Sequence, residues 1–182
     1  TQILADKNCK LIAIAGTHGK TTTTAMTVWL MQELGVPISY LLPAKTSFAD
    51  TGAYIEGSGY FVYECDEFDR NFLAFHPNLS LITGIDWDHP DIYPTVESYN
   101  DAFHTFIGQS DHTIIWQPDA EKLGTVASNT IHVTKYEEAS GVTLPGLVNR
   151  QDGALVVQGI ATLLKKDSEE LVEIINKFPG VS

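Results

Sequence analysis

Short apolar segments recur along the chain with polar stretches between them, and this pattern predicts the order of its structural elements. Several of these segments are continuously apolar rather than alternating, which is typical of strands buried on both faces of a parallel sheet. Strands are therefore predicted at residues 11–16, 38–42, 60–65, 79–85, 112–116 and 131–134.

Two of the intervals between these strands have the spacing of helices. A helix is predicted over residues 22–34, because Gly35 follows it and glycine commonly ends a helix. A second helix can begin at Thr95, which is followed three residues later by Ser98 rather than Glu, so its capping box is expected to be incomplete. The apolar stripe of this helix is formed by Phe103, Phe106 and Ile107.

A third helix is predicted near the end of the chain. Asp167 or Ser168 can cap it, and Glu169 and Glu170 follow in the first turn, where the helix dipole favours acidic residues. Strands that alternate with helices predict an α/β fold with a mostly parallel sheet flanked by helices, in a single domain over residues 1–182. The apolar positions of the third helix follow the i, i+3, i+4, i+7 spacing: Leu171, Ile174, Ile175 and Phe178.

Composition narrows the classes of function. A net charge of −12 argues against a broad nucleic-acid-binding surface, since phosphate backbones recruit Lys and Arg. The two cysteines, Cys9 and Cys65, form no C-x-x-C pair and fit a reduced intracellular protein. No apolar run approaches the roughly 18 residues needed to cross a bilayer, and no signal peptide opens the chain, so we expect no membrane partner and a cytoplasmic location.

The segment GTHGKTTTT, which begins at Gly16, carries the strongest chemical signal. It follows a predicted buried strand and opens a predicted helix, where free N–H groups and the helix dipole favour a phosphate. Gly16 and Gly19 permit a loop tighter than the usual G-x-x-x-x-G-K-[ST] pattern. Lys20 supplies a charge for the outer phosphates, and the hydroxyl of Thr21 or Thr22 can bind Mg²⁺. A glycine turn without a ligand is the simpler alternative, but the flanking strand and helix favour a nucleotide site.

Acidic residues gather where the predicted strand 60–65 ends. Ligands of open α/β sheets collect outside the carboxyl ends of the strands, and a carboxylate there can hold the Mg²⁺ that bridges nucleotide phosphates. Glu64 is the candidate, because it closes the apolar run. Part of the acidic segment after Glu64 is interpreted as a solvated loop. Arg70 or a cation would relieve the repulsion among its carboxylates. These further acids are Asp66, Glu67 and Asp69.

The next predicted strand is followed by a polar cluster of Asp86, Asp88 and His89, before Pro90 forces a turn. His89 can bind a metal through its neutral imidazole, although a D-H-P turn taken alone is more often structural. The ends of three successive strands would then carry Lys and Thr, then Glu, and then His. Together these side chains would make a metal–nucleotide site. Four other histidines show no ligand spacing: His76, His104, His112 and His132.

Together these motifs resemble the Mur ligase family, which builds the cytoplasmic precursor of peptidoglycan, and in particular its P-loop-containing central ATP-binding domain. GTHGKTTTT is similar to the family's short G-T-x-G-K-T loop. ECDEFD at residues 64–69 is similar to its E-A-D-E-x-D segment, and TGIDWDH at 83–89 to its T-N-I-x-x-D-H segment. LPGLVNRQDGA at 144–154 resembles the P-G-x-H-N-x-x-N-A segment less closely. The likeness covers nearly the whole chain and is greatest to the branch that joins L-alanine to UDP-N-acetylmuramate.

The resemblance implies ATP-dependent formation of an amide bond. ATP would phosphorylate the carboxylate of UDP-N-acetylmuramate, and the amine of L-alanine would attack the acyl phosphate. The implied catalytic residues are Lys20 on the β- and γ-phosphates, Glu64 and His89. Thr21 and Glu64 would bind one Mg²⁺, His89 would bind a second, and Asn149 would contact the adenine. The implied nucleotide-binding set is Gly16, Thr17, His18 (facing the substrate), Gly19, Lys20, Thr21, Thr22 and Asn149.

The chain also departs from the family pattern. Gly84 stands where the family has Asn, and Val148, Asp152 and Gly153 stand where it has His, Asn and Ala. Family members have an N-terminal domain for the UDP moiety and a C-terminal domain for the amino acid, and neither is expected in this chain. The chain alone should therefore bind ATP and Mg²⁺ without completing the ligation. Two alternatives stay open: a murein tripeptide-recycling ligase of the same family, and a drifted, non-catalytic nucleotide-binding module.

Overall fold

The structure is a computed structural model that describes residues 8–66, 72–124, 131–134 and 141–181. At its centre is a seven-stranded sheet in the order β3-β2-β4-β1-β5-β6-β7. Neighbouring strands are parallel except for β3, which pairs antiparallel with β2. The strands are β1 (Lys10–Ala15), β2 (Ile38–Leu41), β3 (Gly52–Ala53), β4 (Tyr60–Glu64), β5 (Leu79–Ile82), β6 (His112–Trp116) and β7 (Ile131–Thr134).

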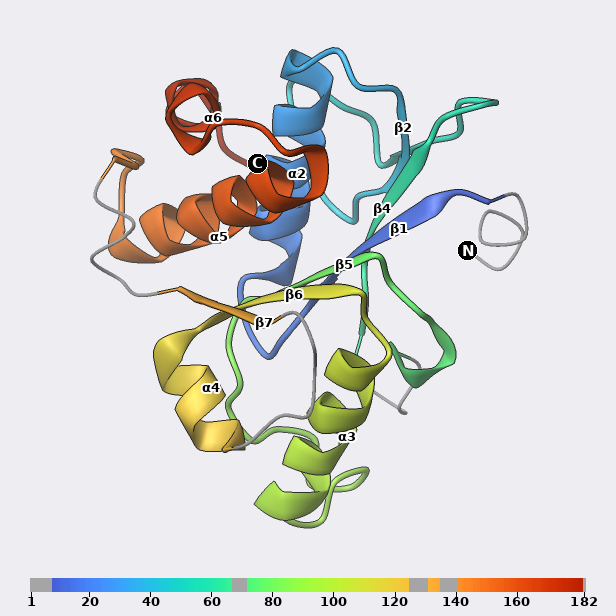
Figure 1. Ribbon diagram of the computed structural model, residues 1–182, viewed down its shortest axis with the longest axis vertical. Helices are drawn as coiled ribbons and strands as arrows, with labels where there is room; N and C mark the ends of the chain where they lie inside the picture. The colour runs from blue at the N-terminus through green and yellow to red at the C-terminus, as the bar shows by residue number, and fades with distance from the viewer. Residues whose placement is uncertain (1–7, 67–71, 125–130, 135–140, 182) are drawn as a thin grey trace.

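Helices cover both faces of this sheet (Figure 1). Helices α2, α5 and α6 lie on one face, and α3 and α4 lie on the other. The predicted α/β fold with a mostly parallel sheet flanked by helices is therefore confirmed. The helices are α2 (Lys20–Glu33), α3 (Val96–Gly108), α4 (Gln117–Leu123), α5 (Leu147–Leu164) and α6 (Ser168–Ile175).

The central strand β1 shows why its apolar run is continuous. Ile12 and Ile14 belong to the core beneath α2 and α5, whereas Leu11, Ala13 and Ala15 belong to the core beneath α3. All five are buried. A strand covered on both faces has no solvent-facing side, so polar residues would be costly at every position.

The register of the sheet brings three chain segments to one edge. Strand β1 lies between β4 and β5, with Ile14 opposite Glu64 and Ala15 opposite Ile82. The segments that follow these parallel strands therefore leave the sheet side by side, as the sequence predicted for the three strand ends.

The helix ends agree with the predicted ones to within about three residues: α2 begins at Lys20 rather than at residue 22, and Phe178, predicted on the third helix, lies beyond the end of α6 at Ile175. Gly35 follows α2 with a φ of +68°, as expected for a helix stop. The capping box of α3, predicted to be incomplete, is complete. Ser98 takes the place of Glu, because Ser98 N donates to Thr95 Oγ1 at 3.1 Å and Thr95 N donates to Ser98 Oγ at 3.2 Å. Asp167 caps α6 by accepting a hydrogen bond from Glu169 N at 2.8 Å.

Three elements of the structure were not predicted: β3, α4 and α5. Helix α5 is the longest of the described helices, with 18 residues, and it packs against β5 and β6 as well as against α2 and α6. Gly159 lets it approach the sheet closely, since a Cβ there would lie 2.5 Å from Leu81 Cδ2. Within the described residues, no helix has both the length and the apolar character needed to span a bilayer.

Candidate functional site

The segment between β1 and α2 is a tight turn built on two glycines with positive φ. Gly16 has a φ of +130°, and a Cβ there would collide with Thr83 Oγ1 and the carbonyl oxygen of Gly84. Gly19, with a φ of +81°, is the N-cap of α2. No side chain in the described part of the chain caps this helix, so the N–H groups of its first turn are available to an anion.

A pocket of about 310 Å³ lies at this helix start. Lys20 Nζ donates a hydrogen bond to the carbonyl oxygen of Gly16 at 2.7 Å, and Thr21 Oγ1 donates one to Glu64 Oε2 at 2.8 Å. The pocket thus combines a cation with a hydroxyl–carboxylate pair, and such oxygen atoms are the ligands that Mg²⁺ prefers. Its lining residues are Thr17, His18, Gly19, Lys20, Thr21, Thr22 and Glu64.

The run of threonines divides between the pocket and the core. Thr21 and Thr22 line the pocket, whereas Thr23 and Thr24 are buried. Thr24 Oγ1 donates to the carbonyl oxygen of Lys20 at 2.8 Å, the back-bond that Thr commonly makes inside a helix. Only the first half of the run can therefore serve a ligand.

His89 lies outside this pocket. It follows β5 on a loop, has a φ of +54°, and its backbone N–H donates to Asp88 Oδ1 at 2.7 Å. Within the described residues, no group of three or more His, Cys, Asp or Glu side chains could hold a metal ion, so the role of His89 as a ligand stays a prediction. Of the further acids after β4, Asp66 is exposed, whereas Glu67, Asp69 and the neighbouring Arg70 lie outside the described residues.

The loop that carries His89 is tied to the glycine turn by Thr17. Thr17 Oγ1 accepts a hydrogen bond from Asp86 N at 2.9 Å, donates one to Asp86 O at 2.8 Å and lies 2.9 Å from the Tyr99 hydroxyl. Thr17 N donates to the carbonyl oxygen of Gly84 at 2.9 Å. A Cβ on Gly84 would meet no atom within 4 Å, so glycine at this position keeps the main-chain contact and leaves space beside it.

Helix α4 holds the same loop from the other side. Lys122 Nζ donates to the carbonyl oxygen of Ile85 at 2.9 Å and to Asp86 Oδ1 at 2.8 Å, and the bond to Asp86 raises the pKa of Lys122. The buried Asp119 accepts from Ile85 N at 3.1 Å and lies 3.3 Å from Lys122 Nζ. These contacts could not be predicted, because α4 itself was not predicted.

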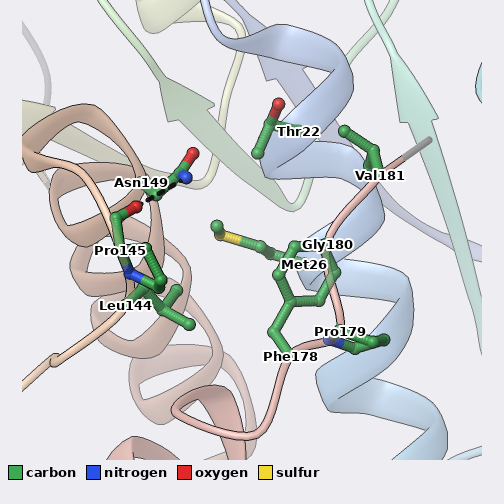
Figure 2. A pocket seen from close by; sticks show the side chains of 9 residues that line it. All are labelled: Thr22, Met26, Leu144, Pro145, Asn149, Phe178, Pro179, Gly180 and Val181. Atoms are coloured by element: carbon green, nitrogen blue, oxygen red, sulfur yellow. Dashed lines mark hydrogen bonds between the residues drawn. The ribbon is translucent and has the colours of Figure 1, made fainter.

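A second pocket, of about 240 Å³, adjoins the first through Thr22, which lines both (Figure 2). Met26 of α2 and Phe178 supply apolar surface, and Asn149 at the start of α5 supplies a carboxamide. Asn149 Nδ2 donates to the carbonyl oxygen of Pro145 at 2.8 Å, which fixes the side chain. The lining residues are Thr22, Met26, Leu144, Pro145, Asn149, Phe178, Pro179, Gly180 and Val181. The exposed Val148 is not among them.

Asp152 is a buried acid that the sequence interpretation noted only as a departure from a motif. Its side chain is 3% exposed, and both carboxylate oxygens lie 3.1–3.2 Å from where a Cβ on Gly19 would be. Burial raises the pKa of Asp152 to about 7, and the Thr23 hydroxyl opposes this shift only in part. Only the packing of α5 against α2 brings this acid to the glycine turn.

Comparison with known proteins gives relatives in both sequence and structure. A family model described as the Mur ligase middle domain matches residues 14–156. The chain is 35% identical over 130 residues to a UDP-N-acetylmuramate–L-alanine ligase of Roseiflexus castenholzii, a match that covers 63% of this chain and 27% of the relative. It is 40% identical over 125 residues to the ligase of that name from Lactobacillus johnsonii, covering 69% and 26%. The chain thus spans about a quarter of the length of the curated relatives it matches.

Two solved structures share the whole fold. A UDP-N-acetylmuramate-alanine ligase from Thermotoga maritima superimposes with a TM-score of 0.82 and 25% identity, covering 99% of this chain and 47% of that one. A murein peptide ligase from Psychrobacter arcticus superimposes with a TM-score of 0.73 and 19% identity, covering 100% and 50%. At 19% identity, the second likeness shows a common fold alone.

Proposed function

This chain belongs to the Mur ligase family, as its motifs predicted, and on that premise we propose that it is the ATP- and Mg²⁺-binding domain of a ligase that joins L-alanine to UDP-N-acetylmuramate. The observation that carries the proposal is the pair of adjoining pockets at the start of α2, which share Thr22. One pocket contains Lys20 and the Thr21–Glu64 pair, and the other contains Asn149.

We assign the phosphates to the pocket at the start of α2. The uncapped N–H groups of the first helical turn and the helix dipole favour a negative charge there. Lys20 Nζ, which bonds to the carbonyl oxygen of Gly16 at 2.7 Å, would turn to the β- and γ-phosphates of ATP. Phosphoryl transfer depends mainly on positioning and charge neutralisation, and these groups supply both.

The Thr21–Glu64 pair fits a first Mg²⁺. A hydroxyl and a carboxylate oxygen 2.8 Å apart are hard oxygen donors beside the phosphate pocket, and a cation would replace the hydrogen bond between them. When bound, Mg²⁺ neutralises charge on the phosphates during transfer. We assign His89 as the residue that would hold a second Mg²⁺, which would supply further charge neutralisation during phosphoryl transfer.

The adenine is assigned to the second pocket. Its apolar residues, Met26 and Phe178, suit a flat base, and the carboxamide of Asn149 offers hydrogen bonds to the edge of the ring. Thr22 lies where the base pocket meets the phosphate pocket, so a single nucleotide would occupy both.

We propose that residues 1–182 form this one domain of a larger cytoplasmic protein. The chain spans about a quarter of its curated relatives, and the UDP-N-acetylmuramate and L-alanine sites are assigned to N- and C-terminal domains outside it. The 182-residue chain should therefore bind Mg²⁺–ATP but should not complete the ligation.

Calorimetric titration of the chain with Mg²⁺–ATP tests the nucleotide site. Replacing Lys20 by Ala should weaken binding about 10- to 100-fold, because a charge-assisted hydrogen bond contributes about 1.5–3 kcal/mol. Chelating Mg²⁺ should also weaken binding. The matched control is Lys10→Ala at the opposite end of β1, where Lys10 Nζ lies over the Tyr60 ring. Unchanged affinity in Lys20→Ala would contradict the assignment.

The reaction itself is tested on the full-length protein, with L-alanine and a murein tripeptide as competing acceptors. ATP-dependent ligation of L-alanine is expected. Ligation of the tripeptide alone would assign the protein to murein recycling, and nucleotide binding without ligation of either acceptor would identify a non-catalytic module.

A further inference from the structure

The carboxyl group of Asp152 adjoins the proposed nucleotide site but is not among the groups assigned to bind ATP or Mg²⁺. It lies on α5 about one helical turn beyond Asn149, and α5 packs against α2. Its Oδ2 atom is buried and has no hydrogen-bond partner within normal distance among the described residues, and the same is true of the hydroxyl of Thr23, whose interaction with Asp152 opposes the rise in the pKa of this acid only in part. Buried polar atoms are nearly always paired, because leaving one unpaired is costly, so this atom requires an explanation.

The glycine turn between β1 and α2, called the phosphate loop from here on, lies directly against this carboxyl group. Both oxygens lie 3.1–3.2 Å from the position of a Cβ on Gly19, which caps α2 and lines the phosphate pocket. The carboxyl group of Asp152 and a phosphate in the pocket would therefore adjoin the same glycine.

The start of α2 favours one negative charge, and a second charge beside it would be repelled. An ionised Asp152 would compete with a phosphate for the helix dipole and would repel it. A neutral Asp152 removes that repulsion and leaves the field of the helix to the phosphate.

The surroundings of Asp152 favour its neutral form. Asp152 is almost completely buried, so its carboxyl group is shielded from water, which would otherwise stabilise the charged form. Burial accordingly raises the pKa of Asp152 to about 7. The charged groups on the helices packed around it are Lys20 and the exposed Glu33 on α2, Arg150 on α5, whose Nη1 donates to the carbonyl oxygen of Leu144 at 3.2 Å, and the exposed Glu169, Glu170 and Glu173 on α6. Glu64 is the charged residue at the carboxyl end of β4, His18 directly precedes Gly19 and lines the phosphate pocket, and His112 begins β6, against which α5 packs.

We propose that nucleotide binding by this chain is coupled to protonation of Asp152. The loop binds the phosphates of ATP tightly only while Asp152 is neutral, so binding above neutral pH transfers one proton from solvent to the Asp152 carboxylate. Asp152 is thus a positioning residue that acts on the phosphates through Gly19. This inference rests on the proposed ATP site.

The test compares Mg²⁺–ATP affinity of the unmodified chain and of Asp152→Asn over about pH 6 to 9. Affinity of the unmodified chain should fall with rising pH relative to Asp152→Asn, by at most about tenfold per pH unit, because one proton is linked. ATP itself titrates in this range equally for both chains, so the ratio of their affinities isolates Asp152. Asp101→Asn, at an exposed position on α3, is the matched control and should follow the unmodified chain.

Proton uptake gives a second readout that needs no variant to fold. Binding enthalpies measured near pH 8 in buffers of different ionisation enthalpy should show uptake of close to one proton, beyond that of the nucleotide, by the unmodified chain. Affinity ratios that stay constant with pH, or binding without this uptake, would overturn the coupling and leave the ATP site in place. Failure of both chains to bind Mg²⁺–ATP at every pH would overturn the proposed function and this inference with it.

Discussion

Replacing Asp152 by Asn is expected to stabilise the ligand-free chain near neutral pH, although changes to buried residues usually destabilise. Burial raises the pKa of Asp152 to about 7 from an ordinary value of 3.8. Between these values the folded chain keeps a proton that the unfolded chain has released. The stabilisation from this group is therefore fully present below the unfolded pKa and is lost as the pH rises through the folded pKa.

The magnitude follows from the size of the shift. A difference of about 3 pKa units corresponds to about 4 kcal/mol, of which about 3 kcal/mol is lost between about pH 4.5 and pH 8. The Asn variant does not titrate, but its buried amide beside Thr23 needs a partner, which costs about 1 kcal/mol. Asp152→Asn should therefore be slightly less stable than the unmodified chain in acid and about 2–3 kcal/mol more stable near pH 8.

Urea unfolding followed by circular dichroism over a series of pH values measures this difference. Other titrating groups contribute equally to both chains, so the difference in free energy of unfolding isolates Asp152. Asp119→Asn is the matched control, because Asp119 is also buried but accepts from Ile85 N and lies 3.3 Å from Lys122 Nζ. That variant should lose stability near pH 8. A difference between the unmodified chain and Asp152→Asn that does not change with pH would refute the reasoning.

Two further predictions concern packing and the loop after β5. Gly159→Ala should lower the free energy of unfolding by about 1–3 kcal/mol, because its Cβ would lie 2.5 Å from Leu81 Cδ2. Gly108→Ala is the control, because its Cβ would meet no atom within 4 Å. Equal urea midpoints for the two variants would contradict the close packing at Gly159. Lys122→Met should destabilise the chain by about 1–2 kcal/mol, a modest effect because the Lys122 side chain is half-exposed. It should also speed hydrogen exchange at Ile85 N, because Lys122 holds the loop that follows β5. An unchanged exchange rate at this amide would contradict the prediction.

Sequence patterns predicted the strands well because burial on both faces leaves a strong local signal. Burial on several sides also explains why α5 was not predicted from its pattern of apolar residues. That helix is surrounded by the sheet, α2 and α6, so its apolar residues follow no single stripe, and Gly153 and Gly159 within it argue against a helix. Helix α6, with one buried side, showed the expected spacing and was predicted.

The candidate site divides in the same way. Lys20, Thr21 and Glu64 come from segments next to strand ends, where chain order and the parallel sheet together place them in one pocket. The contacts of Thr17 with Asp86 and Tyr99 depend on side chains that meet only after folding, so no spacing along the chain announces them.

Asp152 is another residue that reaches the site only after folding, and it brings a titratable group there. The short turn brings the first residues of α2 against α5, and glycine at position 19 is favoured for two reasons: its φ of +81° and the tight contact that a Cβ would make with Asp152. Because of this close approach, a residue far along the chain adjoins the phosphate loop. Asn and Asp have nearly the same shape, so an acid at this position leaves the packing unchanged and alters only the electrostatics of the loop. The expected consequence of an acid rather than Asn at this position is therefore the proposed dependence of ATP binding on pH, and it arises in a part of the fold that the loop motif alone does not describe.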